Sequence, residues 1–421
     1  MPLEELRALQ NTRLSALVSR LYSRVPFYKE QFDQIGLHPK EIKTVADLSK
    51  IPFTRKSDLR DNYPYGMFAK PLTEVRRIHA SSGTTGKPTV VGYTRNDLDL
   101  FDEVTARSLQ CAGAQPGMIM HNAYGYGLFT GGLGMHGGAT KLGMAVIPVS
   151  GGMTERQLTI IQDFKPEVIC CTPSYAQTLS EEFAKRGIDT GNLALKYAVL
   201  GAEPWTEAIR EQVEAGLQVI ATNIYGLSEI IGPGVSQEDF EEKGTGSYIW
   251  EDHFFPEVVD RDTGEPLPYG EEGVLVFTTL TKEAMPLLRY WTNDICAINY
   301  DPNAKRTHIK MSSIKGRADD MLIIRGVNLF HTQVEEVIHE MDFLSPNYRL
   351  IVDRKGTMDQ VTDEVETNSV VGSIETAMID KFRAKIKNTI GLTMGIDLKK
   401  PNSIPRSQGG KLNRILDKRS I

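Results

Sequence analysis

Cysteine is scarce in this sequence of 421 residues. The four cysteines are too few for a disulfide framework and lack the Cys-x-x-Cys spacing of a zinc site; they are Cys111, Cys170, Cys171 and Cys296. No apolar run approaches the roughly 18 residues that a membrane span needs. The first residues are acidic where a signal peptide would be basic. We therefore expect a reduced, cytoplasmic protein with no membrane contact.

An excess of positive charge is also lacking. The chain has 48 Lys and Arg against 54 Asp and Glu, a net charge of −6, whereas general binding to nucleic acid needs a basic surface. Hydrophobic residues make up 40% and charged residues 24%, which excludes extended disorder. Only the end is basic, with 11 Lys or Arg and 2 Asp or Glu in residues 381–421. This run indicates a solvated face or a cover for phosphates.

Hydrophobic patterning predicts an α/β fold. Leucines at helical spacing over residues 3–32 indicate amphipathic helices. Further along, short apolar runs alternate with segments of helical period. The runs lie at 118–120, 145–149, 168–171, 197–200 and 219–221, and the helical segments at 154–164, 174–185 and 205–214. Such alternation is typical of βαβ units around a mostly parallel sheet.

The remaining patterns indicate a β-rich subdomain and a small second domain. β-branched runs between turn signals predict the subdomain at residues 254–300. Strand and helix patterns then alternate, at 321–325, 333–340, 348–353 and 375–390. The length suits a large domain followed by a small one. We place an N-terminal domain at residues 1–318 and an α+β C-terminal domain at 319–421, because a polar crossing separates them.

A loop rich in glycine and hydroxyl groups is the strongest motif. It reads Ser81-Ser82-Gly83-Thr84-Thr85-Gly86-Lys87-Pro88-Thr89. The glycines let the backbone approach a ligand closely, and the hydroxyls and the lysine offer donors to phosphate oxygens. It is not a Walker A loop, because two residues separate the glycines and Pro88 follows the lysine. The alternative is a flexible linker.

This nonapeptide resembles the phosphate loop of adenylate-forming enzymes, which include acyl-CoA synthetases, peptide-synthetase adenylation domains and luciferases. More narrowly, the chain resembles the phenylacetate–CoA ligase family over nearly its whole length, from Pro26-Phe27-Tyr28 to the C-terminal lysine. The resemblance implies that the C-terminal domain is mobile. It also implies that residues Ser82, Gly83, Thr84, Thr85, Gly86 and Lys87 bind ATP.

A second motif reads Tyr225-Gly226-Leu227-Ser228-Glu229. An aromatic face beside a glycine turn can stack on a purine, and a nearby carboxylate can hold a metal that bridges phosphates. Without other evidence, a motif of this kind would be a plain surface turn about half the time. The resemblance implies that Tyr225 lies against adenine, with Gly226 and Ser228 beside it, and that Glu229 is catalytic and binds Mg²⁺.

A third motif, Gly201-Ala202-Glu203-Pro204, lies between a predicted strand and a predicted helix. Open α/β sheets bind ligands at the carboxyl ends of strands, although a plain strand–helix turn explains the motif equally well. The resemblance implies that Gly201 flanks the acyl group. It places Ala202, Glu203, Pro204, Asn223 and Ile224 at the nucleotide.

The next candidates are Asp294 and Arg317. The two oxygens of a carboxylate can accept both ribose hydroxyls, although a lone aspartate is more often an exposed loop residue. The resemblance implies that Asp294 binds ribose, that Arg317 contacts ribose or phosphate, and that Asp319 is the hinge. Relatives often carry arginine where this chain has Trp291, so the chain departs from the family pattern close to Asp294.

Lys411 stands beside Gly409 and Gly410 near the end of the chain. A lysine in a tail is normally solvated, but the family places its adenylation lysine in this motif. The resemblance therefore implies that Lys411 is catalytic and reaches the active site when the small domain closes.

Three aromatic residues are candidates for an acyl pocket: Tyr124, Tyr126 and Phe129. Core packing explains them equally well. A Gly132-x-Gly134-x-x-Gly137 pattern has the glycine spacing of a dinucleotide-binding fingerprint. We do not assign it that role, because no predicted strand directly precedes it and no acidic residue follows at the right distance. Many relatives also carry a Cys/His metal cluster, but residues 237–248 hold neither residue type, so zinc is not expected.

Together the motifs and the resemblance imply an ATP-dependent acid–thiol ligase. It would activate an aryl-acetic carboxylate as acyl-AMP and transfer it to coenzyme A, using ATP and Mg²⁺. Two alternatives stay open: an adenylyltransferase acting on a deazaflavin coenzyme, and a nucleotide-binding regulator that has lost catalysis. A homodimer also stays open.

Overall fold

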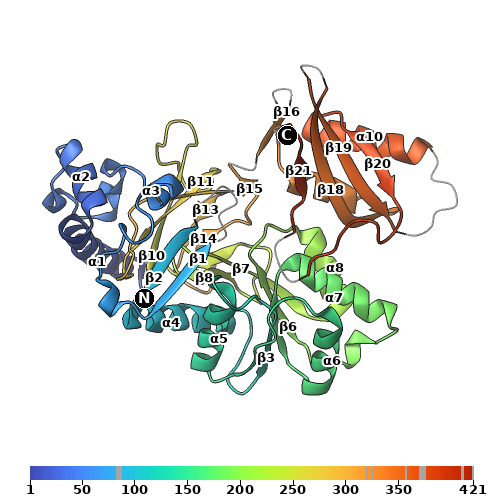
Figure 1. Ribbon diagram of the computed structural model, residues 1–421, viewed down its shortest axis with the longest axis horizontal. Coiled ribbons are helices and arrows are strands. Elements are labelled where there is room, and N and C mark those ends of the chain that lie inside the picture. The colour runs from blue at the N-terminus through green and yellow to red at the C-terminus, as the bar shows by residue number, and fades with distance from the viewer. Residues whose placement is uncertain are drawn as a thin grey trace.

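The structure is a computed structural model and describes residues 1–81, 88–318, 321–324, 327–355, 358–368, 376–408 and 412–419. Its elements form a large N-terminal domain and a smaller C-terminal domain, coloured blue to yellow and orange to red in Figure 1. The small domain lies beside α7 (Pro173–Lys185) and α8 (Glu207–Leu217). The expected boundary at residue 318 follows β15 (Gly316–Arg317), and its exact position stays a prediction.

A mixed sheet with the order β13-β14-β9-β8-β7-β6-β5-β3-β4 forms the centre of the large domain. Neighbouring strands are parallel from β4 to β7 and antiparallel from β7 to β13. The parallel strands are β3 (Ile119–Asn122), β4 (Ala145–Ile147), β5 (Val168–Cys171), β6 (Tyr197–Gly201) and β7 (Ile220–Leu227). The antiparallel strands are β8 (Gly232–Glu238), β9 (Ser247–Ile249), β13 (Ile298–Asn299) and β14 (Lys310–Met311). The predicted parallel βαβ sheet is therefore confirmed.

Helices cover both faces of this sheet. Alternate residues of β5 point to opposite faces: Ile169 packs with α6 (Thr154–Phe164), α7 and α8, whereas Val168 packs with α4 (Arg95–Cys111) and α5 (Gly131–Leu142). Side chains cap the helices that follow the strands. Thr172 accepts a hydrogen bond from the Tyr175 N–H at the start of α7, and Thr206 accepts one from Ile209 at the start of α8. The sheet thus presents the carboxyl ends of β5, β6 and β7 beside helix N-termini.

The predicted β-rich subdomain is an antiparallel sheet with the order β10-β11-β12-β15. Its other strands are β10 (Phe254–Val259), β11 (Gly273–Thr279) and β12 (Tyr290–Cys296). It shares a core with the N-terminal helices α1 (Leu3–Arg24), α2 (Pro26–Gln34) and α3 (Lys56–Asp61). Short 3-10 turns lie at Pro39–Glu41, Val45–Lys50, Leu72–Glu74 and Thr190–Asn192. The hairpin of β1 (Arg77–Ser81) and β2 (Thr89–Tyr93) flanks residues 82–87.

The C-terminal domain is built on a sheet with the order β20-β19-β18-β21. These strands are β18 (Leu344–Lys355), β19 (Met358–Thr367), β20 (Gly395–Lys399) and β21 (Ile415–Asp417), preceded by a hairpin of β16 (Leu322–Ile324) and β17 (Val327–Leu329). The helices α9 (His331–His339) and α10 (Thr376–Ile390) pack on this sheet through Val337, Phe382 and Ile386. The α+β character is confirmed. Among the described helices, none combines the length and the apolar composition that crossing a bilayer requires.

Candidate active site

Tyr225 of β7 and Asp294 of β12 are brought together although they lie far apart in the sequence. The Tyr225 hydroxyl donates a hydrogen bond of 2.6 Å to Oδ2 of Asp294. The Tyr225 ring also stacks on Phe277, with ring centroids 6.3 Å apart and an interplanar angle of 29°. Burial, and next the Asp294 carboxylate, raises the pKa of Tyr225 well above its usual value. The phenol therefore stays protonated and holds one carboxylate oxygen in a fixed direction.

The cationic side chain of Arg317 lies beside Asp294, and that of Arg55 lies over the nearby Trp291 ring. Arg317 is the partner of Asp294 across the β12–β15 ladder, and Arg317 Nη1 lies 3.6 Å from Asp294 Oδ1. Trp291 donates its indole N–H to Asn293 Oδ1 at 2.8 Å, and the Arg55 guanidinium lies 4.3 Å from a Trp291 ring centroid. Arg55 was not predicted, because nothing in its local sequence links it to β12.

Glu229 follows β7 and is buried, with 5% of its surface exposed. Lys56 Nζ lies 4.0 Å from its carboxylate, and the buried Tyr290 hydroxyl hydrogen-bonds to it. Lys282, fully buried, donates to the Glu229 carbonyl at 3.1 Å. Burial lowers the pKa of Lys282 to about 8, while the charges of Asp97 and Glu229 oppose that shift. The Glu229 carboxylate is therefore held at the edge of a cationic environment, which suits phosphates.

The glycines at the ends of β6 and β7 have backbone immediately beside them. A Cβ on Gly201 would stand 2.1 Å from the Ile224 carbonyl oxygen, and a Cβ on Gly226 would stand 1.9 Å from that of Gly232. Ala202 has a φ of 75°, in the left-handed region. The chain therefore turns sharply as it leaves β6, and Gly201 and Ile224 are paired across the ladder. These are the carboxyl ends of parallel strands, where α/β sheets bind ligands.

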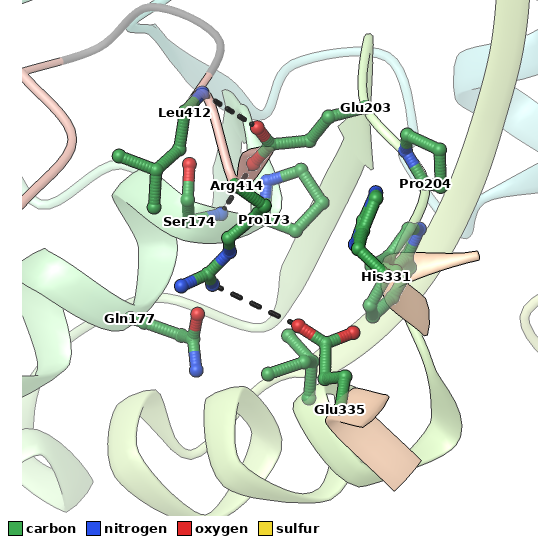
Figure 2. Close-up of a pocket in the computed structure, with 11 residues that line it drawn as sticks. Pro173, Ser174, Gln177, Glu203, Pro204, His331, Glu335, Leu412 and Arg414 are labelled. Atoms are coloured by element: carbon green, nitrogen blue, oxygen red, sulfur yellow. Dashed lines mark hydrogen bonds and ion pairs between the residues drawn. The ribbon is translucent and has the colours of Figure 1, made fainter. Parts of the chain in front are cut away.

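Glu203 links the two domains (Figure 2). Its Oε1 accepts a hydrogen bond of 2.8 Å from the Ser174 N–H at the start of α7. Its Oε2 accepts one of 3.1 Å from the Leu412 N–H of the C-terminal domain. Pro204 lines the same pocket, together with His331 and Glu335 of α9. The third sequence motif therefore lies where the domains meet.

Other predicted nucleotide residues lie around the same strand ends. The Asn223 N–H donates to Glu238 Oε2 at 2.9 Å, and the Ser228 hydroxyl lies 3.1 Å from that of Thr130. Several predictions fall outside the described residues and have no structural account here: Ser82, Gly83, Thr84, Thr85, Gly86, Lys87, Asp319 and Lys411.

The predicted acyl residues occupy different environments. Tyr124 is buried in a hydrophobic cluster, and its hydroxyl lies 3.5 Å from the Val199 carbonyl. The Tyr126 hydroxyl accepts from Asn122 Nδ2 at 2.8 Å and lies 3.1 Å from His136 Nδ1. Phe129 is half exposed. The role of these three residues in acid binding stays a prediction. The contacts of Tyr124 are those expected of a residue that packs in the core.

Sequence reasoning missed the ion pair of Arg406 with Glu181, which joins the two domains, and two ion pairs within the small domain. Arg406 Nε donates to Glu181 of α7 at 2.9 Å, while its Nη2 donates to Glu366 of β19 at 2.8 Å. Arg414 Nη2 lies 3.7 Å from Glu335. No local pattern could have revealed these pairs, since Glu181 and Arg406 are 225 residues apart.

Comparison with known proteins gives the family. Residues 9–281 match the family described as AMP-binding enzyme, and residues 326–419 match the AMP-binding enzyme C-terminal domain. The phenylacetate-coenzyme A ligase of Thermus thermophilus is 60% identical over 100% of this chain and 98% of its own. That of Escherichia coli K12 is 48% identical over 99% of this chain and 96% of its own.

A solved ligase adds information on conformation. Crystal structures of 2-hydroxyisobutyryl-CoA ligase are 26% identical, and each match covers 100% of this chain and 91% of that one. In the postadenylation state with its acyl-AMP, the TM-score to this structure is 0.92; in the thioesterification state it is 0.74. The domain arrangement here is thus similar to the postadenylation state. By its full-length matches, the chain belongs to the AMP-binding enzyme family and, within it, to the phenylacetate–coenzyme A ligases.

Proposed function

We propose that this chain activates phenylacetate, or a closely related aryl-acetic acid, as an acyl-adenylate and transfers the acyl group to coenzyme A. The reaction class, AMP-forming acid–CoA ligation with ATP and coenzyme A, is that of its family. The observation that carries the proposal is the Tyr225–Asp294 bond of 2.6 Å at the carboxyl ends of the sheet. It sets an aromatic face and a carboxylate side by side, as an adenosine site requires.

In this proposal the adenosine lies between β7 and β12. Adenine would rest against Tyr225, and the ribose hydroxyls would donate to Asp294, whose direction Tyr225 and Arg317 already fix. Residues 82–87, which lie between β1 and β2 in the sequence, would bind the phosphates. A preorganised carboxylate reduces the ordering that binding would otherwise require.

The first half-reaction joins the acid to AMP. An oxygen of the substrate carboxylate attacks the α-phosphorus of ATP, the bond to the bridging oxygen breaks, and pyrophosphate leaves. This step needs positioning and charge stabilisation more than proton transfer. We propose that Lys411 stabilises the negative charge that develops between the substrate carboxylate and the α-phosphate in the transition state. Loss of one such donor typically lowers the rate of the chemical step by about 10²–10³.

The second half-reaction makes the thioester. The sulfur of coenzyme A attacks the acyl carbon of the adenylate, the bond to the phosphate oxygen breaks, and AMP leaves. Lys411 has no part in this step in our proposal. The Ser-His-Asp arrangement of acyl-transferring hydrolases is not required, because the adenylate supplies a good leaving group.

Glu229 fits a magnesium ion. Mg²⁺ is usually bound through one or two carboxylates together with substrate phosphates, and Glu229 supplies one buried carboxylate next to the cationic edge of the site. Within the described ranges, no group of three or more His, Cys, Asp or Glu side chains forms a cage for a metal ion. Bound there, the ion would neutralise charge on the leaving pyrophosphate.

Two finer assignments complete the proposal. Tyr126 and Phe129 would line the aryl part of the acid, since both are at least partly accessible in the segment after β3. We also propose a reducing, cytoplasmic compartment, which suits Cys111, Cys170, Cys171 and Cys296, all buried free thiols.

A panel of carboxylic acids tests the function. We expect pyrophosphate release from ATP with phenylacetate at a kcat/KM well above that with acetate or benzoate, and a thioester when coenzyme A is added. Pyrophosphate release with no thioester, and an AMP adduct on a deazaflavin acceptor, would show an adenylyltransferase instead. ATP binding without pyrophosphate release from any acid would show a regulator.

A further inference from the structure

Glu203 is held from two sides by backbone amides of different domains. Its Oε1 accepts the Ser174 N–H at 2.8 Å, and its Oε2 accepts the Leu412 N–H at 3.1 Å. Figure 2 shows the carboxylate pointing from the turn after β6 toward both donors. The Ser174 N–H lies in the first turn of α7, where amides lack partners within the helix and the helix dipole favours negative charge. The large domain thus orients the carboxylate, and the small domain binds to its second oxygen.

The donor from the small domain is the sequence neighbour of the proposed catalytic lysine. Leu412 directly follows Lys411, and consecutive Cα atoms are about 3.8 Å apart across a trans peptide. The hydrogen bond to Glu203 therefore anchors the chain at Leu412, the described residue next to Lys411 in the sequence. Glu203 acts on the chain next to the lysine rather than on the lysine itself.

Contacts before this stretch of chain dock it on the large domain, and a contact after it joins it to α9 of the small domain. Before it, Arg406 binds Glu181, and the Thr178 hydroxyl donates to the Ser407 carbonyl at 3.4 Å. After it, Arg414 lies 3.7 Å from Glu335, whose α9 lines the same pocket. Arg406 and Arg414 orient the segment as a whole. Glu203 holds the residue adjacent to Lys411.

We propose that Glu203 is a positioning residue for the adenylation half-reaction. Its carboxylate fixes the backbone beside Lys411 in the docked arrangement, which is similar to the postadenylation state of a solved ligase at a TM-score of 0.92. Thioester formation does not use this bond. The inference rests on the proposed role of Lys411 and gives Glu203 a function other than direct contact with the nucleotide.

Glu203→Gln tests the proposal, because both carboxylate oxygens accept a bond and the amide keeps one acceptor. A hydrogen bond to a charged group typically contributes enough to change a rate by about 10- to 100-fold. We expect pyrophosphate exchange to fall by that factor through kcat, with the KM for ATP unchanged. Thioester formation from supplied acyl-adenylate should stay at the wild-type rate. Glu207→Gln is the matched control, since Glu207 is exposed and pairs with Arg210 of its own helix.

A double substitution separates positioning from direct contact with the nucleotide. In a Lys411→Ala background, Glu203→Gln should cause no further loss of exchange, because its effect passes through the lysine. An equal fall in both backgrounds, or a higher KM for ATP, would overturn the inference, as would wild-type exchange in Glu203→Gln itself. Glu203→Asp, whose shorter side chain cannot reach both amides, replaces Glu203→Gln if that variant does not fold.

The same experiment identifies a failure of the proposed function. If Lys411→Ala alone exchanges pyrophosphate at the wild-type rate, the lysine assignment is wrong and the role of Glu203 falls with it. If Lys411→Ala is defective and Glu203→Gln is not, the proposed function stands and only this inference is refuted.

Discussion

Removing the Tyr225 hydroxyl tests the nucleotide site with a change of one atom. In Tyr225→Phe the ring and its stacking on Phe277 remain, while Asp294 loses the donor that lies 2.6 Å from Oδ2. Arg317, whose Nη1 is 3.6 Å from Oδ1, still attracts the carboxylate. In the variant the Asp294 side chain therefore keeps its charge but is no longer held in one orientation by the Tyr225 hydroxyl.

The size of the effect follows from these contacts. A hydrogen bond to a charged group is worth about 1.5–3 kcal/mol, and the remaining Arg317 places this case near the lower end. We expect ATP affinity to fall by roughly 10-fold, which corresponds to about 1.4 kcal/mol. The change should appear as a higher KM for ATP with kcat little altered, since the ribose contact is made in both ground state and transition state.

Calorimetric titration with ATP and the pyrophosphate assay measure both quantities. Tyr300→Phe is the matched control, because it also removes a 2.6 Å bond from a tyrosine to a carboxylate, that of Glu251. The control should bind ATP as the wild type does. If Tyr225→Phe also binds ATP with wild-type affinity, Asp294 does not receive the ribose and the site has been misplaced.

Three further outcomes follow from other contacts. Glu238→Gln should lower the free energy of unfolding by roughly 1.5–3 kcal/mol in urea titrations, because the buried Arg210 loses its buried charge partner, 2.8 Å away, and keeps the exposed Glu207. Burial raises the pKa of Glu335 from 4.5 to about 7, with Arg414 opposing. Domain docking should therefore be strongest below about pH 4.5 and should weaken as the pH rises through 7 and Glu335 loses its proton. Fluorescence energy transfer between the domains measures this change. Lys411→Ala should reduce pyrophosphate exchange by about 10²–10³ and leave thioester formation from supplied adenylate intact.

Each of these expectations has an opposite result. An unfolding free energy within about 0.5 kcal/mol of wild type in Glu238→Gln, the scale expected for a surface change, would mean that Glu207 alone compensates the charge of Arg210. The pH dependence of docking should vanish in Glu335→Gln. If it persists there, other groups at the interface carry it; His331, whose pKa burial lowers to about 4, is the nearest to examine. Normal exchange in Lys411→Ala would remove the lysine from the mechanism.

The sequence predicted the parallel sheet well because its strands are short and fully apolar. Val168–Cys171 is buried along its whole length in β5, and the helical segment after it became α7. The strand β19 was missed, because Met358–Thr367 alternates charged residues with apolar ones and includes the buried Asp363. Burial of a carboxylate in a strand opposes the pattern on which such predictions rest.

The candidate site was predictable only where a local motif marks it. Tyr225 and Asp294 lie in recognisable segments, and the fold brings them to 2.6 Å. The bond from Leu412 to Glu203 and the pair of Arg406 with Glu181 join segments more than 200 residues apart. Such contacts depend on how one domain lies against the other, which hydrophobic periodicity does not encode.

The central claim is that adenosine binds between Tyr225 and Asp294 at the carboxyl ends of the sheet. A crystal structure of the chain with a non-hydrolysable phenylacetyl-adenylate tests it most directly. The account predicts the ribose hydroxyls within hydrogen-bonding distance of the Asp294 carboxylate and adenine against the Tyr225 ring. An adenylate bound elsewhere, with both side chains still paired only to each other, would contradict it.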